Sequence, residues 1–436
     1  MPTQAPPKLR LAIIGAGPAG LAAAIEFAKL SFVEARIYEQ ARELREMGAG
    51  ISLHHNTWRM LDALGVYENF DERDLFRPAD GHLVQHRNGR TGELLLSTGQ
   101  EETPARYHQA RTLRTVLQKA LLRSVDRSRL RLSSRLIEIV EMSTGALTLR
   151  FEDGHEDEVD LLVGADGIRS TVRQFAYPDY RLRYTGTTAY RALADASDIL
   201  SIPGFPDANT FWHGPHNRLY TCNLRSNVYE IAARVRLTED AAPVSWGQDA
   251  SVEDFGERFK NFSPMLQRAI AKIRVVKKHA LFNGPRLPRV VSHGSIALVG
   301  DASHPLAGEF GTGAGCAFED AYVLSRAIRW AHDRGHHLSE GLDLFDQVRT
   351  PHYHAMYDIL DGFARSSVSR KKITSFDDAA NQIMEDEWSD GNRWLYHYQV
   401  EDVWHSAWRA EDARRSVPDG DDHKEKANGA ESTSHL

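Results

Sequence analysis

The sequence predicts an α/β fold: a parallel sheet with helices on both faces, an inserted antiparallel sheet, and helices towards the C-terminus. Three observations predict it. Residues 9–38 follow a strand–helix–strand pattern, residues 184–237 hold short strands separated by turn signals, and a strand–helix pattern returns near residue 295. A chain of 436 residues is long enough for two or three packed units.

The first element is a βαβ unit with a glycine-rich turn. Apolar runs at 9–14 and 35–38 flank an Ala-rich helical stretch at 18–30, and the turn reads Gly15-Ala-Gly17-Pro-Ala-Gly20. Gly15 permits the tight turn, Gly17 lets backbone amides approach a pyrophosphate, and Gly20 lets the helix pack on the strand. The helix N-terminus then faces the phosphates.

An acidic residue completes the nucleotide-binding pattern. Glu39 ends the second strand, 19 residues after Gly20. A carboxylate there accepts hydrogen bonds from both ribose hydroxyls and repels a 2′-phosphate. The unit predicts a dinucleotide and leaves FAD and NAD open.

The middle of the chain is rich in strands. Residues 56–64 and 111–122 read as helices, and residues 131–163 read as a β-meander with a turn at Asp153-Gly154. A separate antiparallel sheet is expected from strands at 184–193, 209–212, 218–224 and 228–235.

The α/β pattern returns at 295–299 and continues into helices. A glycine-rich loop precedes a helix at 316–334, and a long helix at 345–365 is expected to bend near Pro351. Residues 416–436 are charged and polar, which is typical of a disordered tail. We therefore expect four units: a nucleotide-binding domain (1–80, 105–183 and 285–365), a substrate-binding sheet domain (81–104 and 184–284), a C-terminal helical region (366–415) and the tail (416–436).

Composition excludes several classes of protein. A net charge of -7 and a pI of about 6.3 give no basic surface for nucleic acid. No window approaches the roughly 18 apolar residues of a membrane span. Cys222 and Cys316 are too few for a disulfide framework or a thiolate cluster, and the His54-His55 and His336-His337 pairs lack metal-ligand spacing, so no metal is expected.

Two further motifs accompany the βαβ unit. One runs from Asp160 to Arg173 and contains Gly-Ala-Asp166-Gly167-Ile-Arg; the other runs Gly300-Asp301-Ala-Ser-His-Pro, then Gly-Thr-Gly313-Ala314-Gly, then Glu-Asp-Ala. With these three motifs in order, residues 9–365 resemble the class A flavoprotein monooxygenases, which include salicylate hydroxylase and para-hydroxybenzoate hydroxylase. The likeness implies a Rossmann-like FAD-binding domain.

The resemblance implies contacts with FAD at particular residues. Residues 47–51, including Ala49 and Gly50, look like the loop beside the ribityl chain. Asp166 and Gly167 look like the motif near the pyrophosphate that is implicated in NAD(P)H binding, although Asp166 is equally suited to cap the following helix. Arg111 resembles an arginine that reaches the FAD phosphates, with a solvated surface arginine as the alternative.

The third motif is implied to hold the flavin itself. Asp301 is expected to bond a ribityl hydroxyl, and the amides of Gly313 and Ala314 to lie against the pyrimidine end of the isoalloxazine. A ring that becomes anionic on reduction suits backbone N–H groups that open a helix. One departure stands out: Gly308 occupies a position where relatives commonly carry proline, and Glu309 and Phe310 beside it are expected to reshape that wall of the site.

The resemblance also implies the reaction. No second G-x-G-x-x-G unit is present, which favours transient binding of NADH or NADPH. The implied chemistry is reduction of FAD, formation of a flavin C4a-hydroperoxide from O₂, and hydroxylation of a small phenolic or aromatic acid. The alternatives are a secondary-metabolite monooxygenase that performs epoxidation or oxidative dearomatisation, and a flavin oxidoreductase without oxygen insertion.

Candidate catalytic residues lie on the antiparallel sheet. Arg191, in Tyr190-Arg191, matches an arginine placed beside the substrate in fungal dearomatising relatives and is able to pair a phenolate or carboxylate; an arginine at a sheet edge is the alternative. Those relatives carry Tyr-Pro where this chain has Cys222-Asn223. Tyr220, on the same face, is the substitute, and His213 is a second candidate base.

The remaining expectations concern partners and location. The N-terminal residues lack the features of a signal peptide, which favours the cytoplasm. The final Ser434-His435-Leu436 resembles a peroxisomal signal, and a polar tail is the alternative. We expect a monomer or homodimer.

Overall fold

The computed structural model of the chain describes residues 7–44, 49–100, 102–236, 247–370, 373–388 and 394–416. Met47, Gly48, the tail at 417–436 and its final tripeptide Ser434-His435-Leu436 lie outside these residues, so the expectations placed on them are left as predictions.

A six-stranded sheet forms the base of the molecule, in the order β18-β19-β11-β1-β2-β7. All neighbours pair in parallel except β18 and β19. The central strands are buried apolar runs, as expected for a sheet covered on both faces. Its strands are β1 (Leu9–Ile14), β2 (Val33–Tyr38), β7 (Leu130–Arg131), β11 (Leu161–Gly164), β18 (Val291–Ser292) and β19 (Ile296–Leu298).

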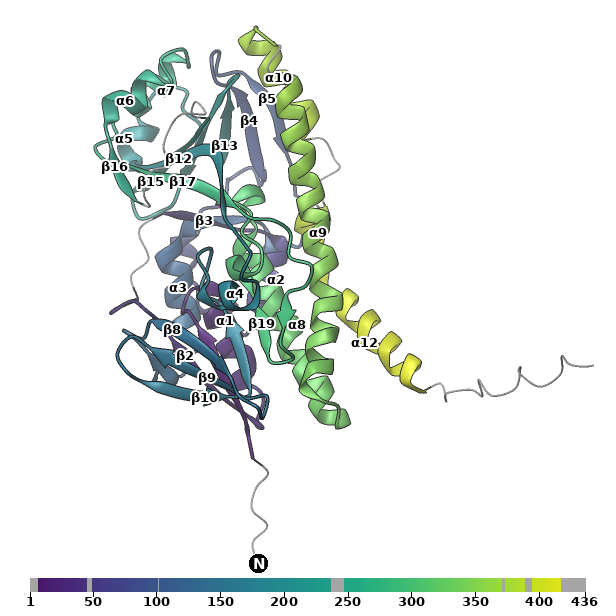
Figure 1. Cartoon of the computed structure of the whole chain (residues 1–436). Coiled ribbons are helices and arrows are strands. Elements are labelled where there is room, and N and C mark those ends of the chain that lie inside the picture. Colours follow the sequence, from purple (N-terminus) through teal and green to yellow (C-terminus); the bar gives the residue numbers. More distant parts are fainter. Residues whose placement is uncertain are drawn as a thin grey trace, which may run out of the picture.

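Helices pack around this sheet and build the largest core (Figure 1). α1 (Pro18–Ala28) packs along α8 (Gly313–Arg334), and both are rich in buried alanine, which allows close approach. α2 (His55–Ala63) packs on α8, and α3 (Arg114–Leu122) packs on α1, whereas α4 (Thr171–Ala176) packs against β11, β19 and the strand at Leu136–Glu141. Short 3₁₀ turns lie at η1 (Tyr67–Asn69), η2 (Glu72–Asp74), η3 (Ala105–Tyr107), η4 (Arg127–Arg129), η5 (Gly300–Ala302) and η6 (Glu309–Gly311).

Two small sheets attach to the base. β8 (Leu136–Glu141), β9 (Leu147–Phe151) and β10 (Glu156–Val159) form the antiparallel meander that the sequence predicts. β3 (Gly50–Leu53) pairs with β6 (Ala110–Leu113) and lies between the base and the upper sheet.

The upper, eight-stranded sheet is called the substrate sheet below. Its order is β16-β17-β12-β15-β14-β13-β4-β5, antiparallel except at β13 and β4. One face is covered by α5 (Ala196–Leu200), α6 (Val252–Glu257) and α7 (Pro264–Ile270) over a second core. The strands are β4 (Val84–Asn88), β5 (Leu94–Thr98), β12 (Arg183–Asp195), β13 (Thr210–His213), β14 (Asn217–Asn223), β15 (Val228–Arg236), β16 (Gln248–Ala250) and β17 (Val276–Asn283).

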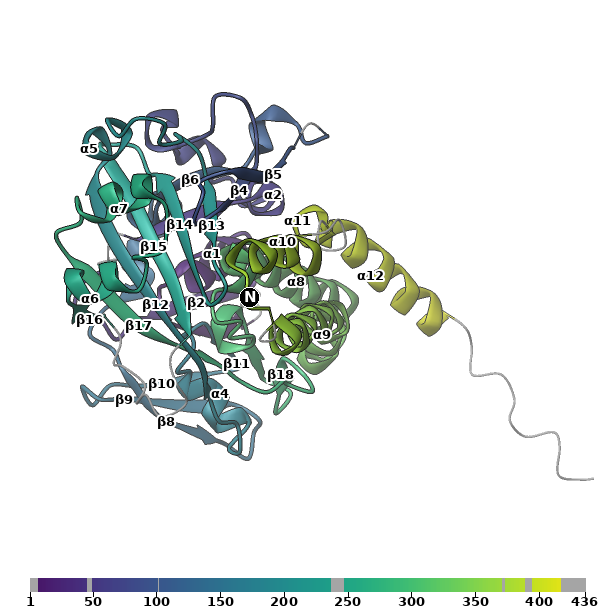
Figure 2. The same cartoon turned by 90° about the horizontal axis from the view of Figure 1, so that it is seen from above.

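The C-terminal helices join the two sheets. α9 (Leu338–Arg370) runs alongside both, with Pro351 inside it (Figure 1). α10 (Phe376–Glu387) lies against β4 and β5, whereas α11 (Trp394–His397) and α12 (Val400–Ser416) lie beside α2, α8 and α9 (Figure 2). Among the described residues, none of the helices has the length and apolarity that a bilayer crossing requires.

The predicted fold class is confirmed, with differences in detail. The predicted helix at 111–122 is wrong at its start, because residues 110–113 are extended in β6 and the helix begins at Arg114. The substrate sheet also contains β17, and β4 joins it by parallel pairing with β13. The long helix begins at Leu338, earlier than expected, and α8 begins at Gly313.

Candidate FAD and substrate site

The glycine-rich turn has the geometry that its residues predict. Gly15 has φ of +103°, and a Cβ there would lie 2.4 Å from the carbonyl oxygen of Ala165. A Cβ at Gly20 would lie 1.9 Å from the oxygen of Gly15, so this glycine permits helix–strand contact. A Cβ at Gly17 would meet nothing within 4 Å. Only Gly17 therefore faces open space, on the side where a ligand would lie.

Glu39 and Asp166 both lie at this turn. Glu39 Oε2 accepts a hydrogen bond of 2.8 Å from the amide of Ala16. The Cα of Asp166 is 3.1 Å from a Cβ built at Gly15. Asp166 Oδ2 accepts from the amides of Thr171 and Val172, the first two of α4, whereas the N-cap residue of this helix is Ser170. The other oxygen of Asp166, Oδ1, is buried with no hydrogen-bond partner among the described residues, and burial raises the pKa of Asp166.

The loop that carries Asp301 is brought to the same place. A Cβ at Gly300, which has φ of +60°, would lie 2.9 Å from the Cβ of Ala19 in the first turn of α1. Arg173 donates to the carbonyl oxygens of Asp301 (3.1 Å) and Ala302 (2.8 Å) and so ties the second and third motifs together. The three motifs therefore meet at the carboxyl edge of the parallel sheet.

The Asp301 side chain is exposed, yet its environment is that of a recess. Surrounding protein raises the pKa of Asp301, while the charges of Arg114 and Arg173 act in the opposite direction. Its Oδ1 lies 4.0 Å from the position of a Cβ at Gly313, the first residue of α8. Asp301, Gly313 and Ala314 thus lie together, as the third motif predicts.

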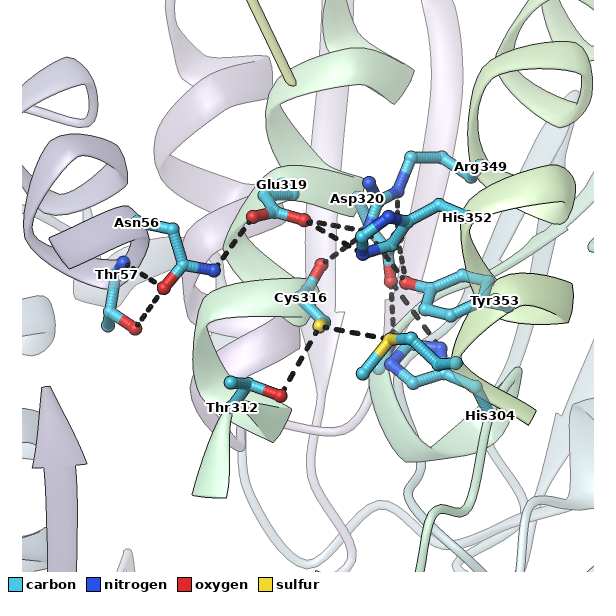
Figure 3. A network of polar contacts seen from close by, with 12 residues as sticks. Asn56, Thr57, His304, Thr312, Cys316, Glu319, Asp320, Arg349, His352 and Tyr353 are labelled. Atoms are coloured by element: carbon cyan, nitrogen blue, oxygen red, sulfur yellow. Dashed lines mark hydrogen bonds and ion pairs between the residues drawn. The ribbon is translucent and has the colours of Figure 1, made fainter. Parts of the chain in front are cut away.

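A buried ion cluster behind the loop fixes its position (Figure 3). Asp320 of α8 accepts from the amide of Gly300 (2.9 Å) and from Nε of Arg349 in α9 (2.8 Å), and the hydroxyl of Tyr353 donates to it. Arg349 also lies 3.0 Å from Glu319. Because all of these side chains are fully buried, the Gly300–Asp301 turn has little freedom to shift.

The same cluster contains a group of potential metal ligands. Ligand atoms of Cys316, Glu319 and His352 lie within 4.8 Å of one another. The Arg349 cation lies 3.0 Å from Glu319 and 2.8 Å from Asp320, so a positive charge already occupies these carboxylates. Cys316 Sγ lies 3.9 Å from the hydroxyl oxygen of Thr312. The Arg349 charge opposes a metal ion, and the cluster reads as a hydrogen-bonded ion network.

These residues fit FAD. Both α1 and α8 begin without a side chain of the described residues capping them, so their first amides are available to anionic groups. Gly17 faces open space beside the start of α1, and Asp301 lies beside the start of α8, so both motifs leave room for a ligand with anionic groups.

Arg111 lies elsewhere than a phosphate contact requires. Its Nη2 pairs with Glu230 of β15, its Nη1 donates to Ser52 (2.8 Å), and its guanidinium lies 5.1 Å from the ring of Tyr220. The side chain is 7% exposed and held on the substrate-sheet side. Arg114, which begins α3 and acts electrostatically on Asp301, is the arginine nearer the predicted flavin site.

Gly50, at the start of β3, contacts the substrate sheet directly. Its amide donates to Glu230 Oε1 (2.9 Å), and a Cβ there would lie 2.3 Å from Arg111 Nη2. Ala49 accepts from the amide of Arg114 (2.9 Å). The predicted ribityl loop is therefore fixed to the substrate sheet through Glu230 and to α3 through Arg114.

Arg191 and Tyr220 lie on the face of the substrate sheet opposite its second core. Arg191 is 43% exposed at its side chain and lies 3.4 Å from Glu230. The neighbouring protein removes part of the water around its guanidinium, which lowers the pKa of Arg191. The negative charge of Glu230 acts to raise this pKa, and the positive charges of Arg114 and Arg111 act to lower it further. Burial raises the pKa of Tyr220 well above its usual value, so the phenol stays protonated and is suited to donate a hydrogen bond.

His213 is placed differently from the expected base. Its ring is fully buried, and its Nε2 lies 3.0 Å from Nδ1 of His86 on β4. The two rings stack, and His86 also packs against Trp388 after α10. With its side chain enclosed in this cluster, His213 has no exposed atom to offer a substrate.

The loop at 306–311 adopts an uncommon backbone. Ala307, Gly308, Phe310 and Gly311 all have positive φ, between +52° and +68°. Proline is locked near -65° and does not fit at position 308 in this loop, which accounts for the departure from the relatives' pattern. Glu309 points to the substrate sheet and pairs with Arg234 and Arg218.

Sequence reasoning did not find several residues that the fold brings to this site. Glu230 and Arg234 alternate on β15 with residues of the second core, and only the strand register reveals which face they occupy. His54 lies with its Nε2 3.4 Å from a Cβ built at Gly311, and burial lowers its pKa to about 3. Tyr396 donates to the carbonyl oxygen of Phe310 (3.2 Å).

Comparison with known proteins agrees with this arrangement. The family described as FAD binding domain matches residues 8–359. Salicylate hydroxylase of Pseudomonas putida is 30% identical over 370 residues, which cover 79% of this chain and 82% of the relative. A 3-amino-4-hydroxybenzoate 2-monooxygenase of Streptomyces platensis is 28% identical over 406 residues, 90% of this chain and 97% of the relative.

The fold is also that of a solved structure. A salicylate hydroxylase substrate complex superposes with a TM-score of 0.77 at 22% identity, covering 92% of this chain and 98% of the other. At that identity the likeness concerns the fold alone.

Proposed function

The chain belongs to the FAD-binding family of class A flavoprotein monooxygenases, and we propose that it hydroxylates a small phenolic or aromatic acid with NADH or NADPH and O₂. The observation that carries this is the placement of Arg191 and Tyr220 on the face of the substrate sheet whose Arg218 and Arg234 contact Glu309, in the loop that leads to Gly313 and Ala314. Relatives that act on salicylate and hydroxybenzoates support the choice of an aromatic acid.

When bound, FAD supplies hydride acceptance from the nicotinamide and activation of O₂. The chain supplies binding and polarity. Arg191 pairs with the carboxylate or phenolate of the substrate. Pairing with the carboxylate orients the substrate, whereas pairing with the phenolate favours loss of the phenol proton, and the phenolate ring is the more electron-rich nucleophile. The protonated hydroxyl of Tyr220 donates a hydrogen bond that orients the substrate, and the rings of Tyr220 and Phe211, 4.7 Å apart, shield it from water.

For the cofactor, we propose contacts from two sides. Gly15, Gly17, Gly20, Glu39, Asp166 and Gly167 surround the adenosine and pyrophosphate, and Ala49, Gly50, Asp301, Gly313 and Ala314 surround the ribityl chain and ring. Arg114 replaces Arg111 as the arginine on this side, because Arg111 is engaged by Glu230. We divide the chain accordingly into the domains expected from the sequence.

The test is ligand-stimulated reduction. Purified protein loaded with FAD is mixed anaerobically with NADH or NADPH. The loss of flavin absorbance at about 450 nm is followed with and without hydroxybenzoates. We expect an effective acid to speed bleaching at least tenfold and, in air, to gain one atom from labelled O₂. Bleaching with no label in any product would instead favour a flavin oxidoreductase.

Two further expectations accompany this proposal. The chain functions as a monomer or homodimer, which its mass in solution would decide. Its place in the cell, cytoplasm or peroxisome, would be decided by microscopy of the chain tagged at its N-terminus.

A further inference from the structure

Four charged side chains fasten the loop at 306–311 and α10 to the substrate sheet. We call this loop the flavin loop and the four side chains the Glu309 clasp. It consists of Glu309, Glu387, Arg218 and Arg234. Arg234 Nη1 pairs with Glu309 Oε1, Arg218 Nη2 lies 3.4 Å from Glu309 Oε2, and Arg218 Nη1 lies 3.1 Å from Glu387. Each side chain is 11–27% exposed, so the clasp is largely enclosed.

The clasp lies on the substrate-binding face of the sheet. Side chains two apart on a strand share a face. Arg218 therefore shares its face with Tyr220 on β14, and Arg234 shares its face with Glu230 on β15. Glu230 contacts Arg191, which places the clasp and Arg191 on one continuous surface.

The charges of this surface do not balance evenly. In the clasp, two arginines face two glutamates, so the clasp is neutral. Next to it, Arg111 and Arg191 share the single carboxylate of Glu230. Of the neighbouring cations, Lys277 is paired with Asp249, and Arg114 acts on Asp301. Within the clasp and the Glu230 group, four arginines thus face three glutamates, and the excess positive charge belongs to Arg191, the more exposed and more loosely held partner of Glu230. Further along the same face, Arg236 donates to the hydroxyl of Ser367.

We infer that Glu309 is a specificity-determining residue that limits the substrate to a single negative charge. The inference rests on the proposed function and specifies its substrate class. Arg191 receives the one anionic group, while Glu309 occupies Arg234 and shares Arg218 with Glu387, so neither guanidinium group of the clasp is left for a second. A dicarboxylate would have to displace Glu309 or leave its second charge unpaired in an enclosed site, which is costly.

The backbone opposes such displacement. Arg234 Nη2 also donates to the carbonyl oxygens of Gly308 (2.8 Å) and Ala307 (3.3 Å), and Tyr396 donates to that of Phe310 (3.2 Å). Three carbonyl groups of the loop are thus held from outside while Ala307 and Phe310 have positive φ. The loop presents Glu309 to the arginines in a fixed geometry, so its carboxylate is a built-in competitor for anions.

The test is ligand selectivity in Glu309→Gln. The amide keeps the size of the side chain and removes its charge, and the Arg234 bonds to the loop carbonyls are kept. FAD-loaded wild type and variant are titrated with hydroxybenzoates carrying one carboxylate and with the same rings carrying two, and the change in flavin absorption reports binding. We expect wild type to bind the monocarboxylates at least tenfold more tightly, and the variant to reduce or reverse that ratio at least tenfold.

Glu340→Gln is the matched control, since Glu340 forms an ion pair with Arg415 far from the site and should leave the ratio unchanged. Retained flavin and a single cooperative unfolding transition show that Glu309→Gln is folded, even where the loss of the ion pair lowers its melting temperature. If wild type binds monocarboxylates but the variant keeps the same ratio, the inference is wrong and the proposed function stands. If neither protein binds any of the acids, both are overturned.

Discussion

Arg111 on β6 and Glu230 on β15 form a buried ion pair that joins the FAD-binding side of the molecule to the substrate sheet. The same carboxylate accepts from the amide of Gly50 and lies 3.4 Å from Arg191. One side chain thus fixes the predicted ribityl loop and the candidate substrate arginine together.

Replacing Glu230 by Gln should therefore be strongly destabilising. The change leaves the Arg111 guanidinium buried without its counter-charge. We expect this to lower the free energy of unfolding by about 3–5 kcal/mol. Urea unfolding of the two proteins measures it. The double variant Arg111→Met with Glu230→Gln removes the stranded charge and should regain much of the loss; a double variant no more stable than Glu230→Gln alone would contradict this account.

The second and third glycines of the first turn, Gly17 and Gly20, should respond in opposite ways. Gly17→Val adds a side chain where nothing lies within 4 Å, so the apoprotein should fold normally and bind FAD at least tenfold more weakly. Gly20→Ala places a Cβ 1.9 Å from a backbone oxygen. This clash should lower the free energy of unfolding by at least about 2 kcal/mol. Thermal unfolding of the apoproteins and FAD titration separate the two effects.

Asp301→Asn tests the ribityl contact. The amide keeps the shape but loses a charge-assisted acceptor, for which a loss of about 1.5–3 kcal/mol, or tenfold to a hundredfold in FAD affinity, is expected. Fluorescence titration of apoprotein with FAD measures it. Asp343→Asn, which alters an exposed ion pair with Arg289, is the control and should bind FAD like wild type. Equal affinity in both variants would remove Asp301 from the cofactor site.

Tyr220→Phe distinguishes a hydrogen-bond donor from a base. Because burial keeps the pKa of Tyr220 well above 10, its hydroxyl does not ionise in the working range. Its loss should lower kcat/KM about fivefold to fiftyfold without moving either limb of the pH profile. A limb that disappears in the variant would show that Tyr220 does transfer the proton.

Glu319 should make stability depend on pH in an unusual direction. Burial raises its pKa to about 6, with Arg349 opposing, from an ordinary 4.5. The folded protein then binds more protons than the unfolded chain between these values, so this group's contribution to stability falls as pH rises from about 4.5 to 6, by about 2 kcal/mol. The free energy of unfolding, measured with urea at several pH values in this range, should fall less steeply with rising pH in Glu319→Gln than in wild type. The exposed Glu68→Gln should retain the wild-type slope.

Much of this molecule follows from local sequence. The βαβ unit, the meander and the long helix containing Pro351 could be predicted because each depends on neighbours in the chain: a glycine at φ of +103°, a period-two alternation, a long apolar repeat. FAD binding and the family are confirmed for the same reason, since the glycines and acids of all three motifs are set by backbone geometry. Their individual contacts with FAD are still predictions.

The substrate face could not be derived in the same way. Arg111 was placed at a helix start, but tertiary pairing with β3 extends residues 110–113 and turns its side chain towards Glu230. His213 looks like an accessible base in the sequence, and only the packing of His86 and Trp388 encloses it. Glu230, Arg234 and Glu309 are ordinary charged residues until strand register and an uncommon loop bring them together.

The path of the chain between its two sheets limits how the protein can be altered. Strands β4 and β5 leave for the upper sheet, β6 to β11 return, β12 to β17 leave again, and β18 and β19 close the base. A chimera that exchanged the substrate-recognising part with a relative would need several matched junctions, one at each crossing of the chain between the sheets. New selectivity in this scaffold is therefore more accessible through single side chains facing the ligand than through the grafting of whole modules.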